Sequence, residues 1–154
     1  MKMAGMIATL LLASAGSLQA ADLRLHALLD GASVVSATDS LGTGEATATL
    51  SDDGKVRLTM VFGGLSSNVT GATLQLGSSA ENGAAVAPLD VRMEQAAGSV
   101  VDAELTLTPL AAGSVRAGNS YLLVTTSNYP KGEIRGQLVP QPVRLETQGG
   151  AITP

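Results

Sequence analysis

The sequence predicts an all-β protein built as a two-layer antiparallel β-sandwich, with a Greek-key β-barrel as the alternative. Apolar and polar residues alternate in short segments, which is the pattern of strands that bury one face. Clusters of Gly, Asp, Asn and Ser separate these segments and indicate turns. Helical periodicity is weak throughout, so about seven short, turn-linked strands favour a sandwich over a parallel α/β sheet.

Residues 1–20 have the features of an export signal. Lys2 gives a positive start, residues 7–15 are apolar, and small or apolar residues precede Ala21. The apolar stretch is about half of the roughly 20 residues that a membrane span needs, which favours a cleaved leader over a retained anchor. We therefore expect a secreted or periplasmic protein with no membrane span after leader removal. Its segments are a signal peptide at 1–20, a β domain at 21–139 and a C-terminal tail at 140–154.

The first three strands are expected at residues 23–30, 45–50 and 56–62, where apolar side chains recur at every second position. Asp53 and Gly54 lie between the second and third strands, and such a pair between alternating segments indicates a tight hairpin. Asp52 and Asp53 could also bind calcium, but a calcium loop needs several further oxygen ligands. The hairpin turn is the preferred interpretation.

The middle of the chain is less regular. Gly, Ser and Asn residues at 63–68 end the third strand, a fourth is expected at about 72–76, and residues 77–85 are predicted to form a loop. Residues 87–98 fit a strand, although residues 93–97 also fit one helical turn.

The last part of the domain returns to regular alternation. Strands are expected at 101–108, 121–126 and 133–139, the last two as neighbours. Pro109 ends the first of these because proline lacks a donor N–H. The tail from Pro140 is expected to be loosely ordered, although Val143 and Leu145 could add a short edge strand.

Composition excludes several classes of function. The chain carries Lys+Arg 9 and Asp+Glu 13, a formal net charge of −4, and no Cys. Its basic residues are scattered among carboxylates, which argues against nucleic-acid binding. His26, the single histidine, lies on the polar face of the first expected strand and is interpreted as a surface or packing residue, because metal sites and nucleophiles need partners. No hydrolase or phosphate-binding motif is present, so we expect no catalytic residue, cofactor or metal ligand.

A longer motif occupies the last expected strand, where residues 130–138 read Pro-Lys-Gly-Glu-Ile-Arg-Gly-Gln-Leu. Together with upstream features from residue 23 onwards, this segment resembles the C-terminal signature of CHRD domains, the module that recurs in chordin. The resemblance implies an extracellular or periplasmic, immunoglobulin-like β-sandwich with no established catalytic activity. The motif residues to which we assign a structural role are Pro130, Gly132, Glu133, Ile134, Arg135, Gly136, Gln137 and Leu138.

The chain departs from the family pattern at its histidines. Many CHRD domains have a His-x-His element where this chain has residues 73–75 (Thr-Leu-Gln), and His-Thr where it has Thr125 and Thr126. A periplasmic metal-handling or redox-associated protein is therefore the alternative function, suggested by the relatives' histidines and not by this chain.

Two side-chain pairs carry specific expectations. Glu133 and Arg135 are two residues apart on one strand, so they are predicted to share a face, where an ion pair would tie the strand to a neighbour. Tyr121 and Leu123 point to one side of a strand that is apolar on both faces. The face that they form needs a loop, the tail or another chain to cover it. These two residues are the candidate protein contact or self-association surface. The predicted function is an exported, non-catalytic binding or structural module of unknown ligand.

Overall fold

The computed structural model describes residues 21–142 of the 154-residue chain. The expected signal peptide at 1–20 and the expected edge strand at Val143 and Leu145 lie outside these described residues. Val139–Pro140 form a short strand, β10, that pairs with the first strand of the domain, and the Gln141 N–H donates to the Arg24 carbonyl at 2.8 Å. Residues 140 and 141 are therefore attached to the sheet, and the expectation of a loose tail is wrong for them.

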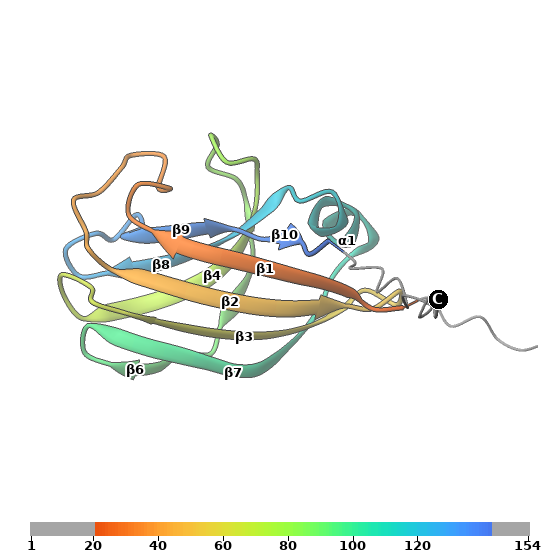
Figure 1. Cartoon of the computed structure of the whole chain (residues 1–154), viewed down its shortest axis with the longest axis horizontal. Coiled ribbons are helices and arrows are strands. Elements are labelled where there is room, and N and C mark those ends of the chain that lie inside the picture. Colours follow the sequence, from red (N-terminus) through yellow and green to blue (C-terminus); the bar gives the residue numbers. More distant parts are fainter. Residues whose placement is uncertain (1–20, 143–154) are drawn as a thin grey trace, which may run out of the picture.

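Ten strands and one helix make up the described domain (Figure 1). In chain order they are β1 Leu23–Asp30, β2 Thr43–Leu50, β3 Lys55–Gly63, β4 Val69–Leu76, β5 Ala85–Leu89, β6 Arg92–Glu94, β7 Ala97–Thr106, α1 Pro109–Arg116, β8 Ser120–Thr126, β9 Ile134–Gln137 and β10 Val139–Pro140.

All ten strands belong to one antiparallel sheet, which confirms the all-β prediction. The strand order is β5-β4-β8-β9-β1-β2-β3-β7-β6, and β10 pairs with β1 beside this path. The sheet curls so that β4 and β8 lie behind β1, β2 and β3 (Figure 1). The two layers are joined at the β9 and β1 step, where Asp30 and Arg135 are partners. The architecture is thus a curled half-barrel, which agrees with the barrel alternative.

Apolar side chains at every second strand position point inward and fill the space between the two layers. In β1, Leu25, Ala27 and Leu29 are buried while the residues between them are more exposed. The facing layer contributes Leu74 of β4 and Leu122 of β8, both fully buried. Because strand side chains alternate between faces, the apolar positions seen in the sequence form one continuous core.

The β2 and β3 hairpin is confirmed at the expected turn. Gly54 has a φ of 83°, a backbone conformation that glycine adopts without a steric penalty. Asp53 accepts a hydrogen bond from the Ser51 hydroxyl at 2.7 Å, and its carboxylate also receives the Lys55 N–H at 3.3 Å. The aspartate therefore stabilises the turn itself.

Helix α1, at Pro109–Arg116, was not expected from the sequence. Thr108 caps it by accepting the Ala111 N–H at 3.2 Å, and Pro109 stands at its first turn, where the missing N–H costs nothing. Pro109 does follow the end of β7 as predicted, but it also begins this helix. Two turns are too short for periodicity to stand out, so the Thr-Pro pair was the one available signal.

Residues 87–98 adopt the strand alternative. They form the end of β5, all of β6 and the start of β7, and Gln95 turns the chain between β6 and β7 with a φ of 52°. No helix of the described part is long and apolar enough to cross a membrane.

Candidate functional site at the loop end

Three connections gather at one end of the curled sheet, which we call the loop end. They are residues 31–42 between β1 and β2, 64–68 between β3 and β4, and 127–133 between β8 and β9 (Figure 1). The family-type motif begins in the third of these connections. The loop end is therefore where the motif can act on other segments.

Glu133 holds the three connections together through its carboxylate, which is fully buried. One carboxylate oxygen receives the Ser40 hydroxyl and the Ser66 N–H, each at 2.6 Å. The other receives the Ser66 hydroxyl at 3.0 Å and the Thr126 hydroxyl at 2.5 Å. We call this set the Glu133 network: Ser40, Ser66, Thr126 and Glu133.

The Glu133 network favours the ionised carboxylate. Burial alone raises the pKa of Glu133, but the hydrogen bonds from Ser40, Thr126 and Ser66 outweigh it and lower the pKa below its usual value. Four donors thus compensate for the missing water. A carboxylate that is buried, ionised and fully hydrogen-bonded in this way acts as a structural anchor.

Arg135 points to a different part of the molecule, so the predicted ion pair with Glu133 is wrong. Its guanidinium lies 3.5 Å from the centre of the Tyr121 ring and donates to the carbonyl oxygens of Glu81 at 2.8 Å and Ser78 at 2.5 Å. Glu133 precedes β9, and Gly132 before it has a φ of 128°, so the alternation of strand faces does not extend to Glu133. Burial also lowers the pKa of Arg135.

Tyr121 and Leu123 are both buried, which corrects the expectation of an uncovered surface. The connection at 77–84 covers Tyr121, whose hydroxyl donates to the Gln75 side chain at 2.6 Å and accepts the Gly83 N–H at 2.9 Å. Leu123 packs under Gly132, where an added Cβ would lie 2.5 Å from a Leu123 methyl carbon. Loops of the same chain supply the cover, so neither residue is available to a partner.

The rest of the motif packs into the sheet. Ile134 and Leu138 are fully buried in the core. A Cβ at Gly136 would lie 2.4 Å from the Leu28 carbonyl oxygen, so glycine permits the close approach of β9 to β1. The Gln137 amide donates to the Gly77 carbonyl at 2.8 Å and to the Gly118 carbonyl at 2.9 Å.

A groove opens beside the Glu133 network and has a volume of about 400 Å³. Three connections form its walls: 31–42, 77–84 and 127–133. We call it the loop-end groove. It is lined by Val34, Ser36, Ala37, Thr38, Asn82, Asn128, Tyr129, Pro130, Lys131 and Gly132.

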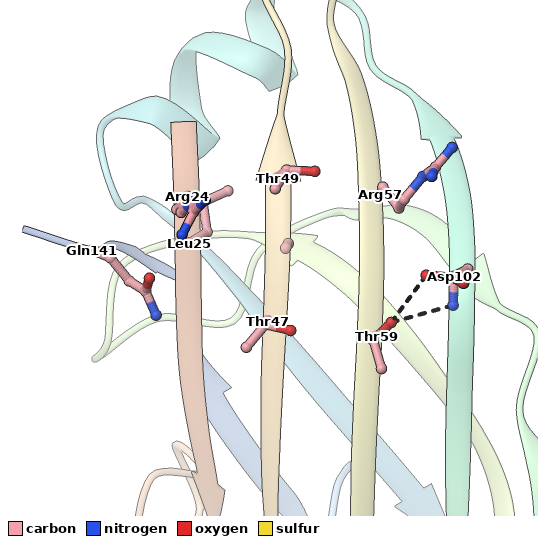
Figure 2. Close-up of a pocket in the computed structure, with 9 residues that line it drawn as sticks. Arg24, Leu25, Thr47, Thr49, Arg57, Thr59, Asp102 and Gln141 are labelled. Atoms are coloured by element: carbon pink, nitrogen blue, oxygen red, sulfur yellow. Dashed lines mark hydrogen bonds between the residues drawn. The ribbon is translucent and has the colours of Figure 1, made fainter. Parts of the chain in front are cut away.

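A second hollow, of about 300 Å³, lies on the outer face of β1, β2, β3 and β7 (Figure 2). Register places Thr49 between Arg24 and Arg57 across the strands. Two of its polar groups already have partners in the chain: the Arg57 guanidinium contacts the Glu104 carboxylate, and Thr59 hydrogen-bonds with Asp102. The outer hollow is the smaller of the two and lies on a strand face, whereas the loop-end groove lies beside the buried Glu133 network.

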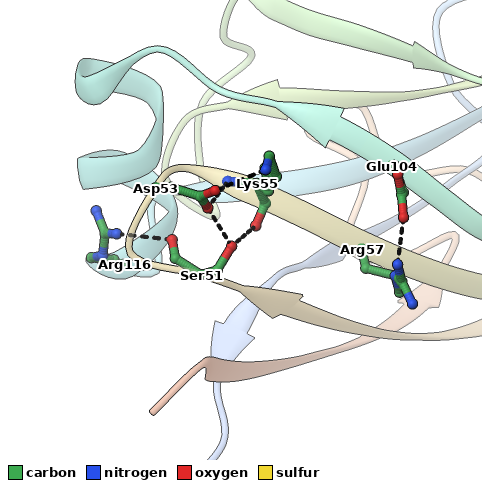
Figure 3. Close-up of polar contacts among 6 residues, drawn as sticks. All are labelled: Ser51, Asp53, Lys55, Arg57, Glu104 and Arg116. Atoms are coloured by element: carbon green, nitrogen blue, oxygen red, sulfur yellow. Dashed lines mark hydrogen bonds and ion pairs between the residues drawn. The ribbon is translucent and has the colours of Figure 1, made fainter. Parts of the chain in front are cut away.

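Exposed charges near the β2 and β3 hairpin also pair with one another or with backbone (Figure 3). Lys55 lies 3.0 Å from Asp53, and Arg116 donates to the Ser51 carbonyl at 3.3 Å. The hydrogen bond from the Ser51 side chain, followed by those from Lys55, lowers the pKa of Asp53 to about 2. This carboxylate serves the turn, which supports the hairpin interpretation over a calcium site.

His26 forms a contact of 3.1 Å with the Glu45 carboxylate on the outer face of the sheet. Between residues 21 and 142 no three His, Cys, Asp or Glu side chains gather in a way that could hold a metal ion.

The fold and its buried anchors define a class of protein: an all-antiparallel β module whose motif charges organise its own loops. The profile of the CHRD domain family matches residues 25–138 of the chain. The chain therefore belongs to the CHRD domain family, whose members are extracellular β modules that are in general non-catalytic. No curated protein and no solved structure matches the chain.

Sequence reasoning identified the motif but missed its partners and the groove. Ser40 and Ser66 are distant in sequence from Glu133, by 93 and 67 positions, and occupy ordinary loop segments. Tyr129, the aromatic residue of the groove, stood within a turn pattern that indicated only a change of chain direction. No local signal distinguishes a serine that binds a buried carboxylate from one that faces water.

Proposed function

We propose that the chain is an exported, non-catalytic CHRD module that binds a ligand in the loop-end groove. The observation that carries this proposal is a concave site in which three polar side chains are not used by the chain itself. Ser36, Asn82 and Lys131 line the groove, and their side chains make no hydrogen bond with any other residue in 21–142. Such groups are open to a ligand in place of water.

Rigid support for the groove favours binding. The wall at residues 127–133 is held by the Tyr129 carbonyl, which accepts the backbone N–H groups of Thr126 and Gly132, and by the Glu133 network beside it. Binding residues commonly lie on loops that a rigid scaffold positions. A groove held in this way binds without first losing the entropy of loop ordering.

The absence of enzymatic activity is supported by how the buried charges are used. Glu133 and Arg135 are the buried charged residues of the described chain, and both have their hydrogen bonds satisfied by the protein. Neither points into the groove, whose lining is given above. A general acid or base would need to reach a bound substrate.

The test is affinity capture from the envelope of the exporting cell with the exported chain as bait. Three baits are compared: wild type, the double variant Tyr129→Ala/Lys131→Gln, and Lys55→Gln, which removes one exposed charge far from the groove. We expect a ligand that wild type and Lys55→Gln retain and the double variant loses. A ligand retained equally by all three baits, or none recovered by wild type, contradicts the proposal.

The metal-handling alternative calls for a different measurement. Elemental analysis of the purified exported chain is expected to show zinc and copper well below one ion per chain. One tightly bound ion per chain would support that alternative and would require ligands beyond those that the described residues bring together.

A further inference from the structure

We propose that the ligand of the loop-end groove is a hydroxyl-rich molecule with a single acid group per unit, in the class of the uronic-acid units of extracellular polysaccharides. This inference rests on the proposed binding function of the groove. It adds the chemical class of the ligand, which follows from the ring, the hydrogen-bonding groups and the charge of the lining.

A half-buried aromatic ring lines the groove. The chain has one Phe and two Tyr residues and no Trp. Phe62 and Tyr121 are buried, whereas Tyr129 is half-buried and lines the groove. A tyrosine side chain that lines a groove offers an apolar ring face and a polar hydroxyl. A sugar ring has the complementary form, with an apolar C–H face and hydroxyls around its rim.

The groove also presents hydrogen-bonding groups without partners in the described residues. The Ser36 hydroxyl, the Asn82 amide, the Tyr129 hydroxyl and the Lys131 ammonium make no side-chain hydrogen bond to another residue of the described segment. Amides and hydroxyls donate and accept at once, so they match ligand hydroxyls, which do the same. A purely apolar ligand that covered these groups would remove them from water without giving them partners. The cost is about 1–3 kcal/mol for each group that the ligand buries.

The groove carries one positive charge. Lys131 is the only charged side chain among the ten lining residues, and no carboxylate is among them. The chain as a whole is acidic, with a formal net charge of −4, so a carboxylate-free groove with one ammonium is a local exception. One cation suits one acid group per ligand unit. A polyphosphate chain would need a cluster of Lys and Arg.

Size restricts the ligand further. A groove of about 400 Å³ lies near the lower end of the range of roughly 300–1,000 Å³ for small-molecule sites. It can hold one or two sugar units, with the rest of a polysaccharide outside. A protein partner would need contacts well beyond the groove, since stable interfaces bury more than about 1,000 Å².

The experiment is an NMR-detected titration of the full exported chain with tri-uronic acids of the galacturonate, glucuronate and mannuronate types. Each acid is paired with its methyl ester, which keeps the rings and hydroxyls but removes the charge. We expect at least one acid to shift the amide signals of residues 36, 82 and 129–131. We also expect it to bind up to about five-fold more tightly than its ester, which is the upper range for one exposed charge pair.

Variants separate the contributions of ring and charge. Lys131→Gln is expected to abolish the preference for the acid over the ester. Tyr129→Ala is expected to weaken both ligands, and Tyr129→Phe to keep the ring contribution. Lys55→Gln, an exposed lysine at the opposite hairpin, controls for net charge and is expected to bind like wild type. Circular dichroism of each variant verifies the fold.

The contrary outcomes are distinguishable. If no acid binds but a captured peptide or protein shifts the groove signals, the ligand class is overturned and the proposed function stands. Equal affinity for acid and ester overturns the inference that the groove recognises an acid group. Signal changes confined to the outer face of β1 and β2 overturn both the ligand assignment and the binding site.

Discussion

Glu133 is the residue on which the loop end depends most. A buried carboxylate with four donors joins three connections, in addition to the hydrogen bonds that Ser127 and Asn128 make with the 64–68 connection. Glu133 stabilises the loop end because its carboxylate has all its hydrogen-bond partners. A buried charge with missing partners destabilises a fold by several kcal/mol. Ser40, Ser66 and Thr126 are therefore as necessary to this buried anchor as the glutamate is.

Glu133→Gln tests this role with almost no change of shape. Glutamine accepts hydrogen bonds at one oxygen only, so donors that now meet the second oxygen would face an NH₂ group. We expect a loss of about 1–3 kcal/mol in the free energy of unfolding, measured by urea denaturation. Glu104→Gln, at an exposed surface pair, is the control and is expected to change stability by less than about 1 kcal/mol.

Stability should also depend on pH through Glu133. Its pKa in the folded protein lies below the unfolded value of 4.5, so the unfolded chain binds the proton more readily as pH falls. The contribution is fully present above pH 4.5 and is lost as pH falls through the lowered folded pKa. Urea unfolding at several pH values should show wild type and Glu133→Gln converging in stability toward acid. A gap that stays constant from pH 7 down to acid would show that ionisation of Glu133 is not involved.

Among the elements, the connection between β4 and β5 best illustrates how loops complete the sheet. Residues 77–84 cover the outer side of β8 and β9, where Tyr121 and Arg135 meet them through hydrogen bonds. Without this cover, an aromatic ring and a stacked guanidinium would lie at the surface. This connection thus covers the apolar face of β8, for which the sequence had suggested a partner chain.

Tyr121→Phe should loosen that connection without unfolding the domain. The change leaves the Gly83 N–H and the Gln75 side chain without their tyrosine partner, so we expect a loss of about 1–2 kcal/mol and faster amide hydrogen exchange at Gly83. Tyr129→Phe is the matched control, because its hydroxyl has no partner within residues 21–142, and it should leave stability nearly unchanged. Unaltered exchange at Gly83 in Tyr121→Phe would count against this account of the cover.

For the molecule as a whole, the decisive feature is the join between its two layers. The sheet passes from β9 to β1 at Asp30 and Arg135, and Gly136 allows the backbones to approach closely. A right-handed twist accumulates along such a sheet and lets it curl around one core. The outer hollow then lies on a strand face of this sheet, and the loop-end groove lies among the connections at its loop end.

Gly136→Ala should strain this join. The added Cβ would meet the Leu28 carbonyl oxygen at 2.4 Å, and backbone on both sides would have to move. We expect a loss of about 2–4 kcal/mol in the free energy of unfolding, measured by urea denaturation. Gly113→Ala in α1, where nothing lies within 4 Å of the added atom, is the control and should stabilise by about 0.5–1 kcal/mol. Equal effects of the two changes would show that β9 and β1 can separate without cost.

The sequence by itself determined the strands of the regular segments, the Asp53 and Gly54 hairpin, the pairing of β8 with β9 and membership in the CHRD family. These features depend on period-two burial, on turn residues and on a continuous motif, all of which act between near neighbours in the chain. The sequence did not predict helix α1, because two turns are too short to show helical periodicity.

The tertiary structure alone decided which side chains meet. It buried Glu133 among hydroxyls up to 93 positions away, turned Arg135 toward Tyr121, covered Tyr121 and Leu123 with loops, and opened the groove beside Tyr129. The physical reason is that a polar loop residue has no periodic pattern to reveal its contacts. Its partner is set only when the sheet curls and brings distant connections to the same end.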